Sequence, residues 1–309
     1  MKKYNIYNRF VKFDFYIDDG VDISIDALKN YLEPYIYIDD NCCETKESDL
    51  TIITLKESTE IVYKDKKVIT KFTDNLSLKR LIIDLVNRII EVNTGIFFHS
   101  SSVVFNDNSY IFIGDKGQGK TTTMLNLLSN QVTSYSSNER TALIKENDVL
   151  LSYGNPARIN IRVNTLRQNK QLYDKLIPVL DLEKYNHLVK QDLSLDCSER
   201  VDISYNDIRK YLEVDVKPIN KTAAIINLLY DPKYDFYLDE IDYEVIKPTL
   251  EKNIISGVYQ DRLFLEQEIG NGIKPSIQIL KDQNIKYYNL YKNNSIDCSK
   301  KLIKRLENE

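Results

Sequence analysis

The sequence has no tryptophan and holds only two histidines and four cysteines among its 309 residues. The cysteines form neither a C-x-x-C pair nor a cysteine/histidine spacing that is typical of zinc sites. This scarcity argues against a cysteine-based metal centre and predicts free thiols in a reducing compartment. The four cysteines are Cys42, Cys43, Cys197 and Cys298.

Long apolar runs are also missing. The first residues mix Lys3, Arg9 and Lys12 with single apolar residues, which differs from the continuous apolar run of a signal peptide. No segment approaches the length that spans a membrane. Lys plus Arg number 42 against 46 Asp plus Glu, and the net charge of -4 gives no overall positive field for nucleic acid or an anionic membrane. We therefore expect a cytoplasmic protein that binds neither.

Apolar patterning divides the chain into two predicted domains, which its length can supply with separate cores. Residues 1–75 contain short runs of alternating apolar and polar residues and one segment with helical spacing, which predicts a small mixed α/β domain. A long amphipathic helix is predicted next, and Asp74 or Ser77 can cap its start. We place the boundary there and expect a second domain over residues 76–309, with a helical pattern after Tyr243.

Two apolar, β-branched runs, from Ile96 to Phe105 and from Ser109 to Ile113, predict a pair of strands around a tight Asn-Asp-Asn turn. The second strand leads into Gly114–Thr121, which fits the pattern G-x-x-x-x-G-K-[ST], and a helical segment follows. A strand before the loop and a helix after it are the context that this pattern requires. We therefore predict a phosphate-binding P-loop.

Each part of the P-loop has a predicted role in holding a nucleotide, for which ATP is the default. The glycines let backbone N–H groups turn toward phosphate oxygens, and the start of the next helix adds its positive dipole end. Lys120 neutralises the terminal phosphates, and the Thr121 hydroxyl can bind Mg²⁺. The predicted nucleotide contacts are Gly114, Asp115, Lys116, Gly117, Gln118, Gly119, Lys120, Thr121 and Thr122.

A P-loop does not name a reaction by itself. Ordinary P-loop ATPases and GTPases carry a second Asp at the end of an apolar strand. Two places imitate it, Asp231 after IINLLY and Asp239–Glu240 after FYL. Neither lies among the alternating strands and helices of a doubly wound fold, so we favour solvated strand edges for both.

The block from FHSSSVVF to GDKGQGKTTTMLNLL resembles the HPr kinase/phosphorylase family and its HPr-kinase-like relatives, which share a core with the ATP-dependent phosphoenolpyruvate carboxykinases. The resemblance covers Ile96 to Val163. It implies an α+β fold in which the P-loop follows a β-hairpin in a mixed, largely antiparallel sheet. His99 lies on the first strand of that hairpin, beside the strand that enters the loop, which suits a role at the phosphates.

The resemblance also implies roles for residues outside the P-loop. In the family, an acidic pair followed by Arg supplies a Mg²⁺ ligand and the base for the acceptor hydroxyl. In this sequence Asn138 and Glu139 stand at the pair, and Arg140 follows. Glu139 is therefore the implied base or a metal ligand, and the Thr121 hydroxyl is the other implied metal ligand. Asn138 is a positioning group. The implied catalytic residues are His99, Glu139 and Lys120.

A short segment beyond the next turn, ARINIRV, predicts a strand with Arg158, Asn160 and Arg162 on one face and Arg167 just after it. Neighbouring arginines can clamp a polyphosphate or an acidic acceptor with paired hydrogen bonds. They can equally form a solvated sheet face, and the sequence leaves both interpretations open.

Two functions follow. The first is a kinase that uses ATP and Mg²⁺ and transfers the γ-phosphate to a hydroxyl: a Ser or Thr of a protein or peptide, including a natural-product precursor peptide, or a small-molecule acceptor. The second is a nucleotide-binding regulatory or scaffold protein, because the Asn138-Glu139 pair departs from the family's two aspartates. The Gly/Arg-rich motif of HPr kinases is not found after Tyr243, which argues against HPr as the acceptor. Partner recognition is expected in residues 1–75, and a homo-oligomer stays open.

Overall fold

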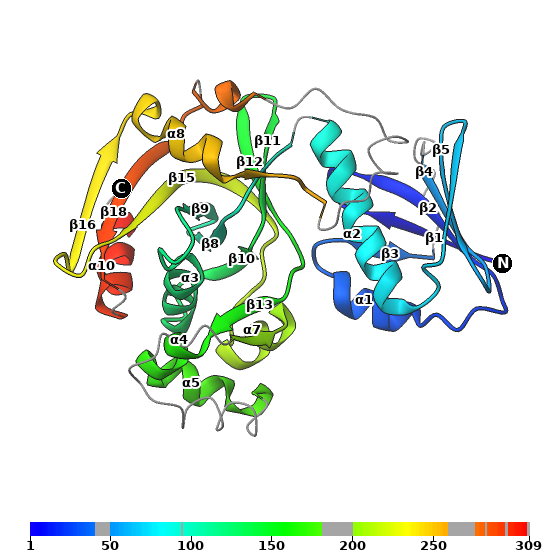
Figure 1. Cartoon of the computed structure of the whole chain (residues 1–309), viewed down its shortest axis with the longest axis horizontal. Coiled ribbons are helices and arrows are strands. Elements are labelled where there is room, and N and C mark those ends of the chain that lie inside the picture. The colour runs from blue at the N-terminus through cyan, green and yellow to red at the C-terminus, as the bar shows by residue number, and fades with distance from the viewer. Residues whose placement is uncertain are drawn as a thin grey trace. The chain divides into compact units, whose positions relative to one another are not determined.

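The computed structural model describes residues 1–40, 50–93, 95–180, 200–258, 276–281, 283–293 and 296–307 (Figure 1). It contains two compact units, Met1–Ile96 with Ser256–Ser276, and Phe97–Ile255 with Ile277–Glu309. Within the described ranges, none of the helices combines the length and apolar character that a bilayer crossing requires. Cys42, Cys43 and Cys197 lie outside these ranges, and Cys298 is buried and forms no disulfide.

The first unit is a six-stranded sheet with two helices. The sheet order is β3-β1-β2-β4-β5-β6, and the β2–β4 pair is parallel whereas the other pairs are antiparallel. In Figure 1 helix α2 lies across one face of this sheet, and it contacts α1. The elements are β1 (Lys2–Tyr7), β2 (Lys12–Ile17), α1 (Ile25–Leu32), β3 (Tyr37–Asp39), β4 (Leu50–Thr54), β5 (Thr59–Tyr63), β6 (Lys66–Thr70) and α2 (Asn75–Val92).

Helix α2 begins as the sequence predicts. The Asp74 side chain accepts hydrogen bonds from the backbone N–H groups of Leu76 and Ser77, at 2.9 and 3.0 Å, which is an N-cap. The contacts group α2 with the N-terminal strands, because its apolar stripe is buried within the first unit. The division between the units therefore falls at Ile96, after α2, and not at the boundary expected before it.

The second unit is built on a mixed sheet of ten strands among the described residues. Eight of them follow the order β10-β8-β9-β15-β12-β11-β7-β17, while β18 joins β15 and β16 joins β18. Strand β15 is parallel to β9 and to β18, and antiparallel to β12. The strands are β7 (Ile96–Phe98), β8 (Ser101–Phe105), β9 (Asn108–Ile113), β10 (Ser134–Asn138), β11 (Thr141–Glu146), β12 (Val149–Gly154), β15 (Ile219–Tyr230), β16 (Phe236–Ile241), β17 (Ile254–Ile255) and β18 (Lys286–Lys292).

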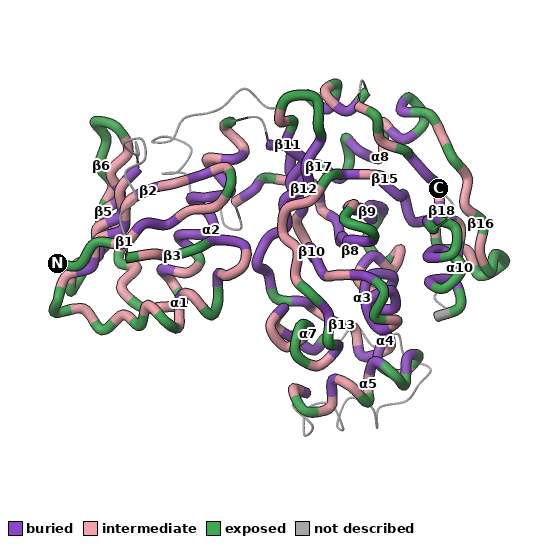
Figure 2. The backbone as a smooth tube through the Cα atoms, turned by 180° about the vertical axis from the view of Figure 1, so that it is seen from behind, coloured by how far each residue is buried: buried purple, intermediate pink, exposed green. Residues whose placement is uncertain are grey.

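The predicted hairpin before the P-loop is present, but its first strand is shorter than expected. Strand β7 ends at Phe98 and pairs with β17, β8 begins at Ser101, and His99 lies between these two strands and not on the hairpin. Strands β8 and β9 pair from Ser101 opposite Phe112 to Phe105 opposite Asn108, and nearly every residue of both is buried (Figure 2). Asn106 and Asp107 form the turn with φ values of 48° and 58°, the left-handed conformation that tight two-residue hairpins favour. The hairpin thus fixes the direction in which the chain enters the loop.

Helices and a small second sheet complete this unit. Strands β13 (Ile159–Arg162) and β14 (Arg200–Ile203) form a separate antiparallel pair. The helices include α3 (Lys120–Ser129), α4 (Val163–Gln168), α5 (Lys170–Leu176), α7 (Tyr205–Leu212), α8 (Tyr243–Asn253) and α10 (Ile296–Glu307), with short 3-10 turns at Ile177–Val179 and Ile277–Leu280.

The C-terminal region is less helical than the sequence suggests. It does contain α8 and α10, but β18 lies between them and pairs in parallel with β15 along seven residues. Apolar residues of β18 such as Leu290 are fully buried in the main sheet. The expectation of a helical C-terminal part is therefore wrong for this strand, because its burial against β15 outweighs the local pattern.

Candidate functional site

The P-loop joins β9 to α3, as predicted, and its glycines adopt conformations that other residues rarely reach. Gly114, Gly117 and Gly119 have φ values of 138°, 95° and 85°. A Cβ on Gly114 would lie 2.8 Å from the carbonyl oxygen of Leu228, so the close approach to β15 also requires glycine. Gly119 is the N-cap of α3 without a capping side chain, which leaves N–H groups of the first helical turn for an anion.

Lys120 is buried inside this loop. Its Nζ donates hydrogen bonds to the carbonyl oxygens of Gly114 at 2.7 Å and Asp115 at 3.4 Å. Burial lowers the pKa of Lys120, while the negative charges of Glu139 and Asp115 act in the opposite direction. The ammonium group is therefore held against the loop backbone, where it can neutralise phosphate.

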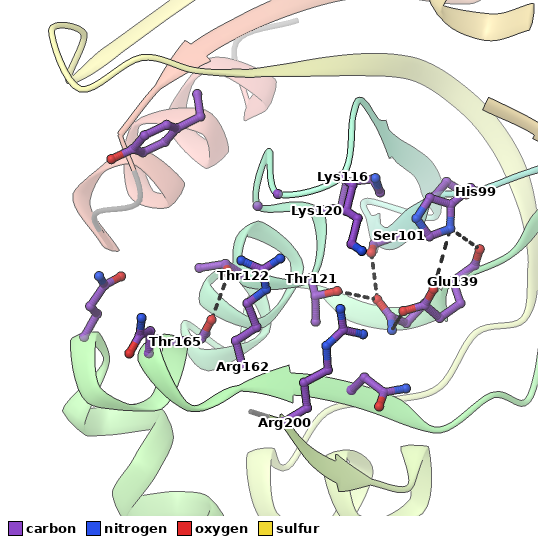
Figure 3. Close-up of a pocket in the computed structure, with 18 residues that line it drawn as sticks. His99, Ser101, Lys116, Lys120, Thr121, Thr122, Glu139, Arg162, Thr165 and Arg200 are labelled. Carbon is purple, nitrogen blue, oxygen red and sulfur yellow. Dashed lines mark hydrogen bonds and ion pairs between the residues drawn. The ribbon is translucent and has the colours of Figure 1, made fainter. Parts of the chain in front are cut away.

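Asn138, fully buried at the end of β10, connects the P-loop helix to the hairpin. Its Oδ1 accepts hydrogen bonds from the hydroxyls of Ser101 at 2.8 Å and Thr121 at 3.0 Å. Its Nδ2 lies 3.5 Å from Oε1 of Glu139. One amide thus brings a β8 hydroxyl, the P-loop hydroxyl and the predicted acid together (Figure 3).

Glu139 and His99 face each other across the end of the sheet. Glu139 lies between β10 and β11 with a φ of 72°, a left-handed conformation that is rare for glutamate. His99 Nδ1 lies 3.5 Å from Oε2 of Glu139 and 3.2 Å from its carbonyl oxygen. A ring that donates from Nδ1 to Glu139 has Nε2 as its acceptor.

Burial, and next the positive charge of Lys120, lower the pKa of His99 below its ordinary value, whereas Glu139 opposes the shift. The neutral imidazole is therefore the main form at neutral pH. A neutral ring is able to take up a proton.

These groups line one cavity of about 730 Å³ in the second unit (Figure 3). Ten of the predicted site residues border it: His99, Lys116, Gly117, Gly119, Lys120, Thr121, Thr122, Asn138, Glu139 and Arg162. The structure therefore brings together the two predicted halves of the site, the P-loop and the His-Asn-Glu group, which are separate in sequence.

Several predicted residues lie elsewhere. Arg158 is exposed and does not border the cavity. Arg140 does not border it either; its carbonyl accepts a hydrogen bond from the Ser137 hydroxyl, and its charge contributes to the lowered pKa of His99. The two alternative acids, Asp231 and Asp239, are also absent from the lining.

Two further P-loop residues border a different cavity. Asp115 and Gln118 line a smaller cavity of about 200 Å³ with residues of β15 and α8. Asp115 forms an ion pair of 2.6 Å with Lys252 of α8, and Gln118 accepts a hydrogen bond from the backbone N–H of Tyr230. These contacts connect the outside of the P-loop to α8 and to the end of β15.

Sequence reasoning missed several cavity residues. Arg200 of β14 and Thr165 of α4 both border the cavity, and the Thr165 hydroxyl lies 3.0 Å from that of Thr122. Ser101 belongs to the run of three serines that directly follows His99, so its closeness to His99 in the sequence could have marked it as a site residue. No local pattern marks Arg200, whose place depends on the pairing of β14 with β13.

No family model matches this chain, and no curated protein shows significant similarity to its sequence. Among solved structures, the chain is similar to the Hpr(Ser) kinase/phosphatase from Coxiella burnetii. The two share 10% identity at a TM-score of 0.30, and the match covers 64% of this chain and 85% of that chain. This likeness is distant, and the interpretation of the site depends on its own geometry.

Proposed function

We propose that this protein is an ATP-dependent phosphotransferase that moves the γ-phosphate to an acceptor hydroxyl. The observation that supports this proposal is the shared cavity, in which Lys120 and Thr121 of the P-loop meet the His99–Glu139 pair. Phosphoryl transfer depends chiefly on positioning and charge stabilisation, and these residues supply both.

In the proposed reaction, the first turn of α3 and the loop N–H groups bind the phosphates, and Lys120 exchanges its loop carbonyl partners for phosphate oxygens. Glu139, assisted by His99, takes the proton of the acceptor hydroxyl as its oxygen attacks the γ-phosphorus. The bond from the γ-phosphorus to the bridging oxygen breaks, and ADP leaves. His99, whose Nδ1 lies 3.5 Å from Oε2 of Glu139, holds that carboxylate in place for this proton transfer.

The residues present fit a magnesium ion, which Thr121 and Glu139 would hold. Thr121 and Glu139 both contact the Asn138 amide, so a hydroxyl and a carboxylate oxygen lie close together beside the P-loop. Such oxygen ligands with phosphates are what Mg²⁺ prefers. Mg²⁺ would neutralise charge that develops on the phosphates. Among the described residues no group of three or more His, Cys, Asp or Glu forms a site for a metal without phosphates.

A nucleotide-binding regulatory or scaffold protein is the second candidate, favoured by one observation. Asn138 Oδ1 already accepts a hydrogen bond from the Thr121 hydroxyl. Asn138 stands where the family has an aspartate, and a neutral amide brings no negative charge to a metal ion. In that case ATP binds without transfer. The acceptor in the first case is proposed to be a protein or peptide Ser or Thr, or a small hydroxylated molecule. We propose partner recognition for the N-terminal unit.

The test is to incubate the full chain with ATP labelled at the γ-phosphate, Mg²⁺ and a panel of Ser/Thr peptides and hydroxylated metabolites, and to measure ATP binding in parallel by calorimetry. We expect label on one acceptor class with wild type and none with Lys120→Ala. ATP binding without label on any acceptor would favour the regulatory candidate. Failure to bind ATP at all would overturn both.

A further inference from the structure

Two arginines face each other on the small sheet beside the P-loop. In the antiparallel β13–β14 pair, Arg162 lies directly opposite Arg200, so both side chains are on the same face. Like charges at directly opposed positions destabilise a sheet unless an anion lies between or above them. An arrangement that is unfavourable for folding alone points to a role outside folding.

Neither guanidinium forms a hydrogen bond or an ion pair with another residue in the part of the chain that the structure describes, although both border the cavity. Figure 3 shows the two side chains extending from their strands toward Thr121 and the P-loop. Asp202, two residues beyond Arg200 on the same strand, does not border the cavity. The two guanidinium groups differ in this from the Lys120 ammonium, which already donates a hydrogen bond to the P-loop backbone.

The described part of the cavity lining has more positive charge than a nucleotide needs. Among the described residues it contains four cationic side chains, of Lys116, Lys120, Arg162 and Arg200, and a single carboxylate, that of Glu139. A magnesium-bound triphosphate neutralises only part of this excess. The amides of Asn160 and Asn164 lie on the same wall as the arginines and offer neutral hydrogen-bond donors.

We infer that Arg162 and Arg200 form a second anion subsite, which recognises a carboxylate or phosphate group of the acceptor. This inference rests on the proposed transferase function and names its substrate class: a hydroxylated acceptor that also carries an anion. The planar guanidinium fork matches both anions with paired hydrogen bonds. The subsite holds the anion and thereby directs the acceptor hydroxyl toward Glu139 and the γ-phosphate.

The competing assignment is that the two arginines bind the nucleotide's own phosphates. Saturation of the full chain with Mg²⁺ and a non-hydrolysable ATP analogue separates the two, because the P-loop is then filled. Inorganic phosphate and, in a second arm, acetate are titrated into this complex by calorimetry. We expect wild type to bind phosphate, acetate or both while the analogue stays bound, and Arg162→Ala or Arg200→Ala to weaken that binding about tenfold or more.

Arg158→Ala is the matched control, since Arg158 is the arginine next to β13 that is exposed and outside the cavity. It should bind the anion as wild type does. The anion that binds identifies the class of acceptor. Binding of phosphate alone indicates a phosphorylated acceptor, and binding of acetate indicates an acceptor with a carboxylate. Two results would overturn the inference: no anion binding to the analogue complex, or a tenfold loss of analogue affinity in Arg162→Ala and Arg200→Ala. Failure of the analogue to bind wild type would instead refute the proposed function.

Discussion

The P-loop wall and the arginine wall of the cavity are built in different ways. The P-loop wall consists of consecutive residues, and its cation, Lys120, is buried and hydrogen-bonded to the loop's own carbonyls. The arginine wall takes one residue from each of two strands, and the guanidinium groups of Arg162 and Arg200 make no such bonds with other described residues. A lysine that is already hydrogen-bonded to its loop suits phosphate held at one fixed position. Two guanidinium groups that border the cavity without such bonds, one half-buried and one exposed, suit a second anionic ligand.

Loss of the P-loop cation should have the largest effect. Lys120→Ala removes the charge that lies against Gly114 and Asp115, and we expect transfer to fall on the order of a thousandfold and ATP binding to weaken. Transfer rates and calorimetry measure the two effects. Lys145→Ala, on the exposed end of β11, is the matched control and should change neither. Unchanged turnover in Lys120→Ala would remove the P-loop from the mechanism.

Glu139→Gln should separate binding from chemistry. The P-loop and Lys120 are unaltered, so ATP binding is expected to persist while transfer falls about a hundredfold or more. His99→Ala should share the defect and add little in the double variant, because the two groups act as a unit across 3.5 Å.

Glu139→Asp is the complementary variant. It keeps the charge and shortens the side chain, so a gain in transfer would indicate that the family's shorter acid suits this cavity better. Transfer by Glu139→Gln equal to wild type would exclude Glu139 as the base, and the acids at Asp231 or Asp239 would be tested next.

The pH dependence of transfer should reflect the lowered pKa of His99. Because burial and Lys120 disfavour the imidazolium, the ring stays neutral through neutral pH and takes up a proton only at a pH below its ordinary range. Transfer is therefore expected to stay constant from neutral pH downward and to fall only as the pH passes through that lowered pKa. The acidic limb should change shape in His99→Ala. A limb identical to that of wild type would assign it to another group.

The smallest effect is expected on stability at the arginine wall. Arg162→Ala or Arg200→Ala removes repulsion between opposed like charges, so Tm should rise or stay within about 2 °C of wild type. Thermal unfolding without added anions measures this, with Arg158→Ala as the control. A marked drop in Tm for either variant would show that these side chains hold the β13–β14 pair together, and the two walls would then not differ as described.

The sequence by itself determined the features that depend on neighbouring residues. Glycine spacing, a β-branched strand before the loop and a helix after it predicted the P-loop, and Gly114, Gly117 and Gly119 do adopt the positive φ values that only glycine reaches readily. The cap at Asp74 and the turn at Asn106 and Asp107 are local in the same sense, since each depends on hydrogen bonds or dihedrals within a few residues.

Only the tertiary structure decided which distant residues share the cavity. Arg200 lies beside Arg162 because two strands far apart in sequence pair in one register, and a shift of one residue would turn Arg200 to the other face. Arg158 belongs to the same arginine-rich segment, but it lies one residue before β13, is exposed and does not border the cavity. Strand β18 likewise has its place through parallel pairing with β15, which no short-range pattern encodes. Local propensity fixes the shape of a loop, but the choice of partners for a side chain depends on long-range pairing and burial.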